Sequence, residues 1–222
     1  MTPLFWGFKG DDDVSTGFSV EAINEMHKSA LQEIGNIGMG NATKSLTFIL
    51  ENSIKLDLPH VQFLEMDKMS DFLGGREEYI VLSALSSITG EINGTVLLVM
   101  RKELVVRILN RIFPQDTVDE NAFTEMQNSA INELCNIFIG SYTSAVATFL
   151  DVDMKISLPY VCIDMLGAVL SSTVVELYTY YDKILVINNY IEAEPENAFH
   201  MFYLPDEESY KKIIIKLGIQ ND

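Results

Sequence analysis

The chain has 222 residues, with 15 basic against 32 acidic side chains and a formal net charge of -17. Its length allows one large domain or two small ones, and 48% hydrophobic with 21% charged residues is a globular composition. Residues 1–100 hold 6 basic and 14 acidic side chains, so the negative charge is not confined to one half. Because phosphate backbones and anionic membranes attract Lys and Arg, this charge excludes nucleic acid as a partner and disfavours a membrane surface.

Two cysteines, Cys135 and Cys162, are too few for a disulfide scaffold. No basic segment followed by an apolar one opens the sequence, so no secretory signal is predicted. The longest uncharged stretch, Leu134 to Leu150, contains five polar residues and falls short of the roughly 20 predominantly apolar residues of a membrane span. We therefore expect a cytoplasmic protein with free thiols and no membrane insertion.

A long helical pattern comes first in the chain. It runs from about Val20, with Ser19 as N-cap, to about Leu50, and the glycines within residues 35–40 predict a kink or break. Residues 1–18 precede this pattern and are expected to form a mobile N-terminal extension. The elements predicted next are three strands and a helix, at Ile54–Leu58, Tyr79–Ile88, Ile92–Met100 and Lys102–Phe113.

The same order of elements follows a second time. A second long helix is expected from near Thr117, whose spacing from Glu120 fits a capping box, to Leu150. Four strands and a closing helix are then predicted, at Met154–Leu158, Val174–Tyr181, Ile184–Tyr190, His200–Leu204 and Glu207–Leu217.

An internal repeat relates the two halves. Residues 29–59 align with residues 129–159 without a gap and are identical at 11 of 31 positions. We therefore predict an α+β fold, a single domain built from a duplicated helix–strands–helix half with internal pseudo-twofold symmetry. The halves span about residues 19–115 and 116–222, which together form the domain.

The polar residues that the repeat preserves fall on one stripe of each long helix. At 100° per residue, each set lies within about 60° of helix circumference. The two sets are Ser29, Glu33, Asn36 and Gly40, and Ser129, Glu133, Asn136 and Gly140. Each half thus presents a carboxylate and a carboxamide one turn apart, over a glycine that leaves room for a partner.

A solvated helix face is the simplest interpretation of such a stripe, and any duplication copies its residues. Neighbouring positions have nevertheless diverged, as Gly38/Phe138 and Asn41/Ser141 show. Preservation of the stripe beside these diverged neighbours favours a functional role for it.

The sequence gives little support for a metal site, a phosphate-binding loop or a reactive cysteine. The three histidines, His27, His60 and His200, show no metal-ligand spacing, and no phosphate-binding loop is present. Cys135 has no neighbouring histidine to activate it and is expected to pack in the core. We predict no metal site and no cofactor of the protein's own.

The spacing of the stripe residues resembles a known signature. Ser29-x3-Glu33-x2-Asn36-x22-Pro59 and Ser129-x3-Glu133-x2-Asn136-x22-Pro159 both resemble the Asp/Ser-x3-Glu-x2-Asn-x22-Pro pattern of the CheC/CheX/FliY family of chemotaxis phosphatases. The resemblance covers about residues 20–219, and two intact motifs are most similar to the CheC type. It implies a CheC-like domain over residues 19–222.

This resemblance also implies a substrate and residue roles. The substrate would be a phosphorylated CheY-like receiver domain that carries its own Mg²⁺. Asn36 and Asn136 would orient the attacking water, and Glu33 and Glu133 would pair with the receiver's lysine. The remaining motif residues would contact the receiver at the rim or support the helix; these are Ser29, Ser129, Pro59, Pro159, Gly40 and Gly140.

Alternatives stay open on the sequence alone. The same fold could bind a receiver, or the deamidase CheD, as an adaptor without turnover, or could serve as a component of a flagellar switch. The exchange of Gly38 and Asn41 for Phe138 and Ser141 predicts two sites that differ in rate or docking.

Overall fold

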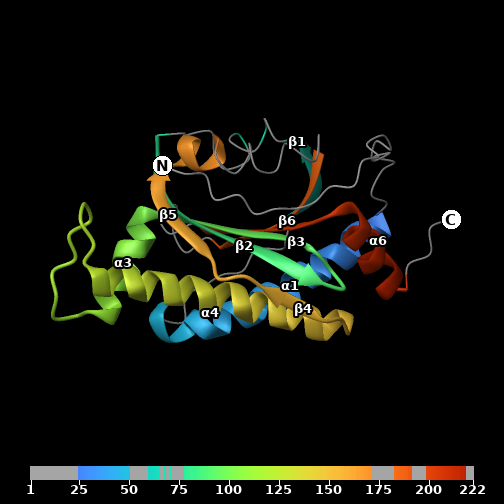
Figure 1. Ribbon diagram of the computed structural model, residues 1–222, viewed down its shortest axis with the longest axis horizontal. Helices are drawn as coiled ribbons and strands as arrows, with labels where there is room; N and C mark the ends of the chain where they lie inside the picture. Colours follow the sequence, from blue (N-terminus) through green and yellow to red (C-terminus); the bar gives the residue numbers. More distant parts are fainter. Residues whose placement is uncertain are drawn as a thin grey trace.

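The computed structural model describes residues 25–50, 60–65, 68, 71, 78–171, 183–191 and 199–218 (Figure 1). The predicted extension at 1–18 and the predicted strands at Ile54–Leu58 and Val174–Tyr181 lie outside these residues. Two long helices, α1 (Glu25–Leu50) and α4 (Glu125–Leu150), have 26 residues each. In the described part of the chain, no helix is long and apolar enough to cross a lipid bilayer.

The described strands form one antiparallel sheet. They are β1 (His60–Glu65), β2 (Ile80–Gly90), β3 (Gly94–Arg101), β4 (Met154–Ile156), β5 (Tyr160–Met165), β6 (Lys183–Ile191) and β7 (Phe199–Pro205). Their order is β1-β6-β7-β3-β2-β4, and β5 also pairs with β2. Helices and a single sheet confirm the α+β class.

Strand pairing crosses between the two predicted halves. β1 pairs with β6 over six residue pairs, from His60↔Asn188 to Glu65↔Lys183. β2 pairs with β5 over six as well, from Ile80↔Met165 to Leu85↔Tyr160. Between them, β3 and β7 form the central pair of the sheet. Each half therefore supplies an edge strand to the other.

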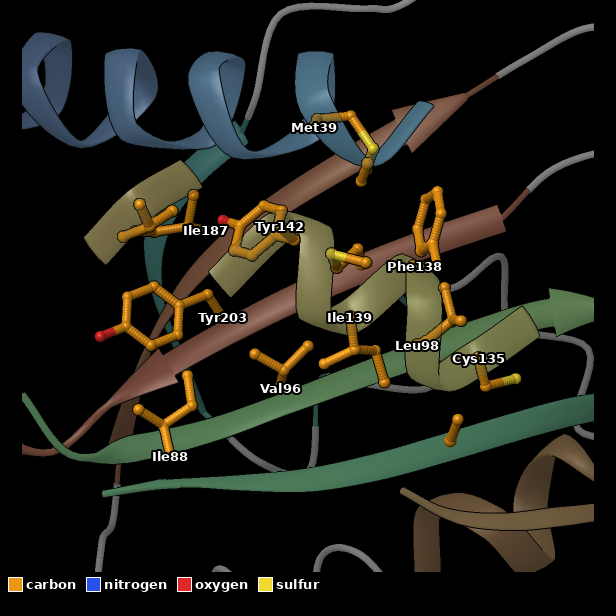
Figure 2. Packing of buried hydrophobic residues seen from close by; sticks show 14 of the residues in the cluster. Met39, Ile88, Val96, Leu98, Cys135, Phe138, Ile139, Tyr142, Ile187 and Tyr203 are labelled. Carbon is orange, nitrogen blue, oxygen red and sulfur yellow. The ribbon is translucent and has the colours of Figure 1, made fainter. Parts of the chain in front are cut away.

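The two long helices lie side by side on one face of the sheet and run in opposite directions (Figure 1). They cross closely at Gly38, where an added Cβ would lie 2.5 Å from a ring carbon of Tyr142. Figure 2 shows Phe138 and Tyr142 of α4 packed beside Met39 of α1 and above the strands. The helix pair and the sheet thus enclose the main core.

Shorter helices complete the two faces. On the face of the long helices, α3 (Lys102–Ile112) and α6 (Glu207–Lys216) add apolar residues to the main core. A helix over residues 166–171 packs on a second apolar cluster that contains Val81, Val186 and Phe202. Both faces of the sheet are therefore covered at least in part.

Two sequence predictions about the long helices are wrong. α4 begins at Glu125 and not near Thr117, because Thr124 forms the capping box: its side chain accepts from the Gln127 N–H, and the Gln127 side chain accepts from the Thr124 N–H. Of the kink or break predicted at residues 35–40, the break is absent, since α1 is one uninterrupted helix there. The glycine at 38 provides space for a neighbouring ring, and it does not interrupt the helix.

The other elements follow the sequence prediction within a few residues. This holds for β2, β3, β6, β7, α3 and α6, and β4 is a shorter form of the strand predicted from Met154. Pattern reading missed β1 and β5, which both lie at edges of the sheet.

Candidate functional sites

The stripe of predicted site residues lies on the surface of each long helix. Ser29 and Glu33 are exposed on α1, and Asn36 and Gly40 are partly exposed. Each equivalent residue of α4 has the same exposure class; these are Ser129, Glu133, Asn136 and Gly140. The structure therefore places all eight stripe residues where a partner can reach them.

The stripe points away from the core because the helix is amphipathic. On α4 the nine buried residues, which include Ile131, Phe138 and Tyr142, centre about 130° around the helix from the stripe. Anchoring that apolar face on the sheet leaves the carboxylate and carboxamide in solvent. The capping box at Thr124 fixes where the helix starts, about one turn before Ser129.

Within the part of the chain that the structure describes, the functional groups of the stripes have no partner. In the described residues, Glu33, Asn36, Glu133 and Asn136 form no hydrogen bond and no ion pair with one another or with other side chains. A carboxamide and a carboxylate that are not engaged internally keep their hydrogen-bonding capacity for a ligand.

Both stripe glycines leave open space. A Cβ added to Gly40 would meet nothing within 4 Å, and one added to Gly140 would meet only Ile156 Cδ1 at 3.6 Å. The backbone beside each carboxamide is therefore accessible. No larger side chain stands at these positions to block an approaching molecule.

The two sites lie apart. Because α1 and α4 run in opposite directions and cross near Gly38 and Tyr142, their N-terminal halves lie toward opposite ends of the helix pair (Figure 1). Asn36 and Asn136 both precede this crossing region in their own helices. Each helix consequently carries its own candidate site.

Divergence at positions 38 and 138 lies inside the core and not at the stripes. Phe138 is fully buried, and Gly38 is buried against Tyr142. Asn41 is exposed, and its Nδ2 donates to the carbonyl of Ile37 on its own helix. The Gly38/Phe138 difference therefore reflects how the helices pack, and it leaves the exposed stripes alike.

Other candidate residues are placed as follows. Cys135 is buried as expected, and burial raises the pKa of its thiol to about 12. Pro159 is partly exposed and directly precedes β5. Pro59 lies outside the described residues. Within the described part, no three His, Cys, Asp or Glu side chains gather as a metal site.

Sequence reasoning missed a groove beside the second site. It runs between the C-terminal half of α4 and β4, has a volume of about 630 Å³, and includes Gly140. Its helical wall is built of small residues, among them Ser144 and Ala147. That run of small residues was the available sequence signal, but the opposite wall depends on tertiary packing.

Comparison with known proteins decides the family. Residues 26–48 match the CheC-like family, and residues 82–180 match the family described as chemotaxis phosphatase CheX. The chain is 30% identical over 201 residues to a CheY-P phosphatase, CheC of Bacillus subtilis, covering 88% of this chain and 96% of the relative. The protein belongs to the CheC/CheX family of chemotaxis phosphatases. Both stripes of this CheC-family chain fall within the matched segments.

Two FliY proteins are also similar to this CheC-family chain. The flagellar motor switch phosphatase FliY of Bacillus subtilis is 27% identical over 143 residues, which cover 64% of this chain and 37% of FliY. The crystal structure of Thermotoga maritima FliY superposes with a TM-score of 0.65 at 22% identity, covering 88% of this chain and 98% of that one. This structural likeness supports the fold.

Proposed function

We propose that this chemotaxis phosphatase hydrolyses the aspartyl phosphate of a CheY-like receiver domain. One observation carries the proposal: two separate helices expose the same Ser, Glu, Asn and Gly stripe, whose functional groups form no side-chain contact with the other described residues. The 30% identical relative is a CheY-P phosphatase, which supports the same substrate class.

The proposed chemistry uses a neutral carboxamide. An acyl phosphate already has a good leaving group, so its hydrolysis depends more on an oriented water than on a strong base. Asn36 or Asn136 would enter the receiver's site and hold water in line with the phosphorus, as a glutamine does in Ras-type GTPases. A neutral side chain also avoids adding negative charge beside the phosphate.

The remaining stripe residues would dock the receiver. Glu33 and Glu133 would pair with its lysine and fix the depth of insertion, and Ser29 and Ser129 would contact its surface at the rim. The Mg²⁺ bound by the receiver would offset phosphate charge, so this chain needs no cofactor of its own. The open backbone at Gly40 and Gly140 supports a close approach.

The predicted duplication is part of this proposal. We propose that each half contributes one catalytic helix, with residues 19–222 forming one domain. The equal lengths of α1 and α4 and the reciprocal pairing of β1 with β6 and β5 with β2 support this origin.

Similarity to FliY favours a second candidate, a phosphatase that works at the flagellar switch. This second candidate would use the same stripes, and it differs from the first in the place where the protein acts. Binding of CheD and the cytoplasmic location stay predictions.

The Asn pair is the decisive test. We expect Asn36→Ala with Asn136→Ala to abolish accelerated phosphate release from phosphorylated Bacillus subtilis CheY with Mg²⁺, a loss of about 10²-fold or more in kcat/KM, while CheY binding persists. Single-turnover phosphate release and a binding titration measure the two effects. Full activity in the double variant would contradict the mechanism, and lost binding with intact folding would assign the residues to docking alone.

A further inference from the structure

The groove beside α4 continues the second stripe. Counting from Ser129 at 100° per residue, Ser144 and Ala147 fall on the same side of the helix as Glu133 and Asn136. Gly140 belongs both to the stripe and to the groove lining. The groove therefore starts where the stripe ends, on one continuous helix face.

Carboxylates line the other side of this groove. Glu91, Asp151 and Asp153 all contribute to it. Glu91 and Asp153 are held together, because the Glu91 N–H donates to the Asp153 carbonyl and the Asp153 N–H donates to Glu91 Oε1, both at 2.9 Å. Lys216 donates to the backbone carbonyl of Asp151 at 3.0 Å, and in the described residues no ion pair engages the carboxylates of Asp151 or Asp153. Glu91 interacts electrostatically with Lys212, so Asp151 and Asp153 are the carboxylates that suit the groove to a cationic group.

A buried hydroxyl in the lining is an independent sign of a missing ligand. Thr143 lines the groove with 3% of its surface exposed, and its Oγ1 has no hydrogen-bond partner among the described residues. At the equivalent position of α1, the Thr43 hydroxyl donates to the Met39 carbonyl at 2.8 Å. Because buried polar groups are nearly always paired in proteins, the Thr143 hydroxyl points to a polar group that binds here.

We propose that the groove is a second contact area for the phosphorylated receiver docked at Asn136, and that it takes a Lys or Arg side chain of that receiver. This inference rests on the proposed function. A standard interface buries about 800 Å² on each partner, a patch of roughly 16 Å radius. At 1.5 Å per residue, Ser144 lies about 12 Å along the helix from Asn136, well inside such a patch.

The first site differs at the corresponding positions. Lys44 and Phe48 of α1 stand where α4 has Ser144 and Thr148. Lys44 is exposed, so it places a positive charge and a long side chain where the second helix has a small hydroxyl. A basic receiver side chain therefore fits better beside the second site than beside the first.

The test removes the groove charges in chains that keep one site each. Glu91→Gln, Asp151→Asn and Asp153→Asn preserve shape, and the amide oxygen of Gln can still accept from Asp153. In an Asn36→Ala background, where only the second site turns over, we expect this triple change to raise the KM for phosphorylated Bacillus subtilis CheY about five- to tenfold with kcat unchanged, and to raise the Kd of one of the two bound beryllofluoride-loaded CheY molecules by the same factor. In an Asn136→Ala background the KM should not change, because turnover then comes from the first site alone.

A matched control separates the effect of the groove carboxylates on receiver binding from the effect of the protein's net charge. Asp116→Asn, Asp119→Asn and Glu120→Gln remove three charges from the exposed loop before α4, beyond its other end. We expect this control to leave KM and Kd within about twofold. Equal effects of the two triple changes, or unchanged KM and Kd in the Asn36→Ala background, would overturn the groove proposal. Activity that survives loss of both asparagines would instead overturn the proposed function.

Discussion

α1 and α4 are alike on the outside and different on the inside. Their exposed stripes share Ser, Glu, Asn and Gly, whereas at the buried crossing Gly38 of α1 meets the ring of Tyr142 of α4. A large ring on one helix fits against a glycine on the other. The difference teaches that packing against the partner helix can diverge without altering the surface that carries the chemistry.

Position 35/135 gives the sharpest contrast between the helices. Gly35 occupies it in α1, and Cys135 fills it in α4 with 1% exposure. Because burial raises the pKa of Cys135 from its usual 9.0 to about 12, we expect alkylation by iodoacetamide at pH 8 at least about a thousandfold slower than for an ordinary thiol. Peptide mass spectrometry over time measures this, with Cys162, which is partly exposed, as the internal control. Rapid labelling of Cys135 in the folded protein would show that the helix pair opens.

Gly38 tests whether the helix crossing is as tight as the two unequal faces require. We expect Gly38→Ala to lower the free energy of unfolding by about 2–3 kcal/mol, because the new methyl group meets the buried Tyr142 ring. Gly40→Ala is the matched change, two residues along and in open space, and should stabilise the helix by up to about 1 kcal/mol. Urea denaturation of both variants measures the difference. Equal stabilities would refute the tight crossing.

The central strands extend the comparison to the sheet. β3 carries no titratable side chain before Arg101, whereas β7 carries His200, and burial lowers the pKa of His200 from its usual 6.5 to about 4. The unfolded chain then binds more protons below pH 6.5, so stability is full above that pH and falls as the pH drops towards 4. From pH 7 to pH 5 we expect this residue to remove about 2 kcal/mol.

His200→Gln isolates that contribution from the carboxylates. Its free energy of unfolding should fall about 2 kcal/mol less between pH 7 and pH 5 than that of the parent protein. If the free energies of unfolding of the two proteins fell equally with pH, His200 would be protonated in the folded state.

Sequence patterns predicted the parts of this structure that depend on local periodicity. Both long helices, the strands β2 and β3 and the exposure of Glu33 and Asn136 follow from the 3.6- and two-residue periods. Even the start of α4 was missed by several residues, because Thr124 competes with Thr117 for the same capping pattern and only the former meets its partner.

Features formed between distant segments could not be predicted. β5 exposes Tyr160 and Met165 and lacks a clear alternation, so only its pairing with β2 defines it as a strand. The role of Gly38 depends on Tyr142, more than 100 residues away in the chain, and the groove needs Glu91 beside Asp153. Each of these is a product of tertiary contact.

The reciprocal edge strands also constrain how the chain is made. His60 pairs with Asn188, so β1 cannot join the sheet until β6 has been synthesised. At about 5–20 residues per second on the ribosome, that wait lasts roughly 6–25 s. Until β5 has been synthesised, β2 in the N-terminal half also has an unpaired apolar edge. Synthesis speed and chaperone supply therefore bear on the yield of this phosphatase.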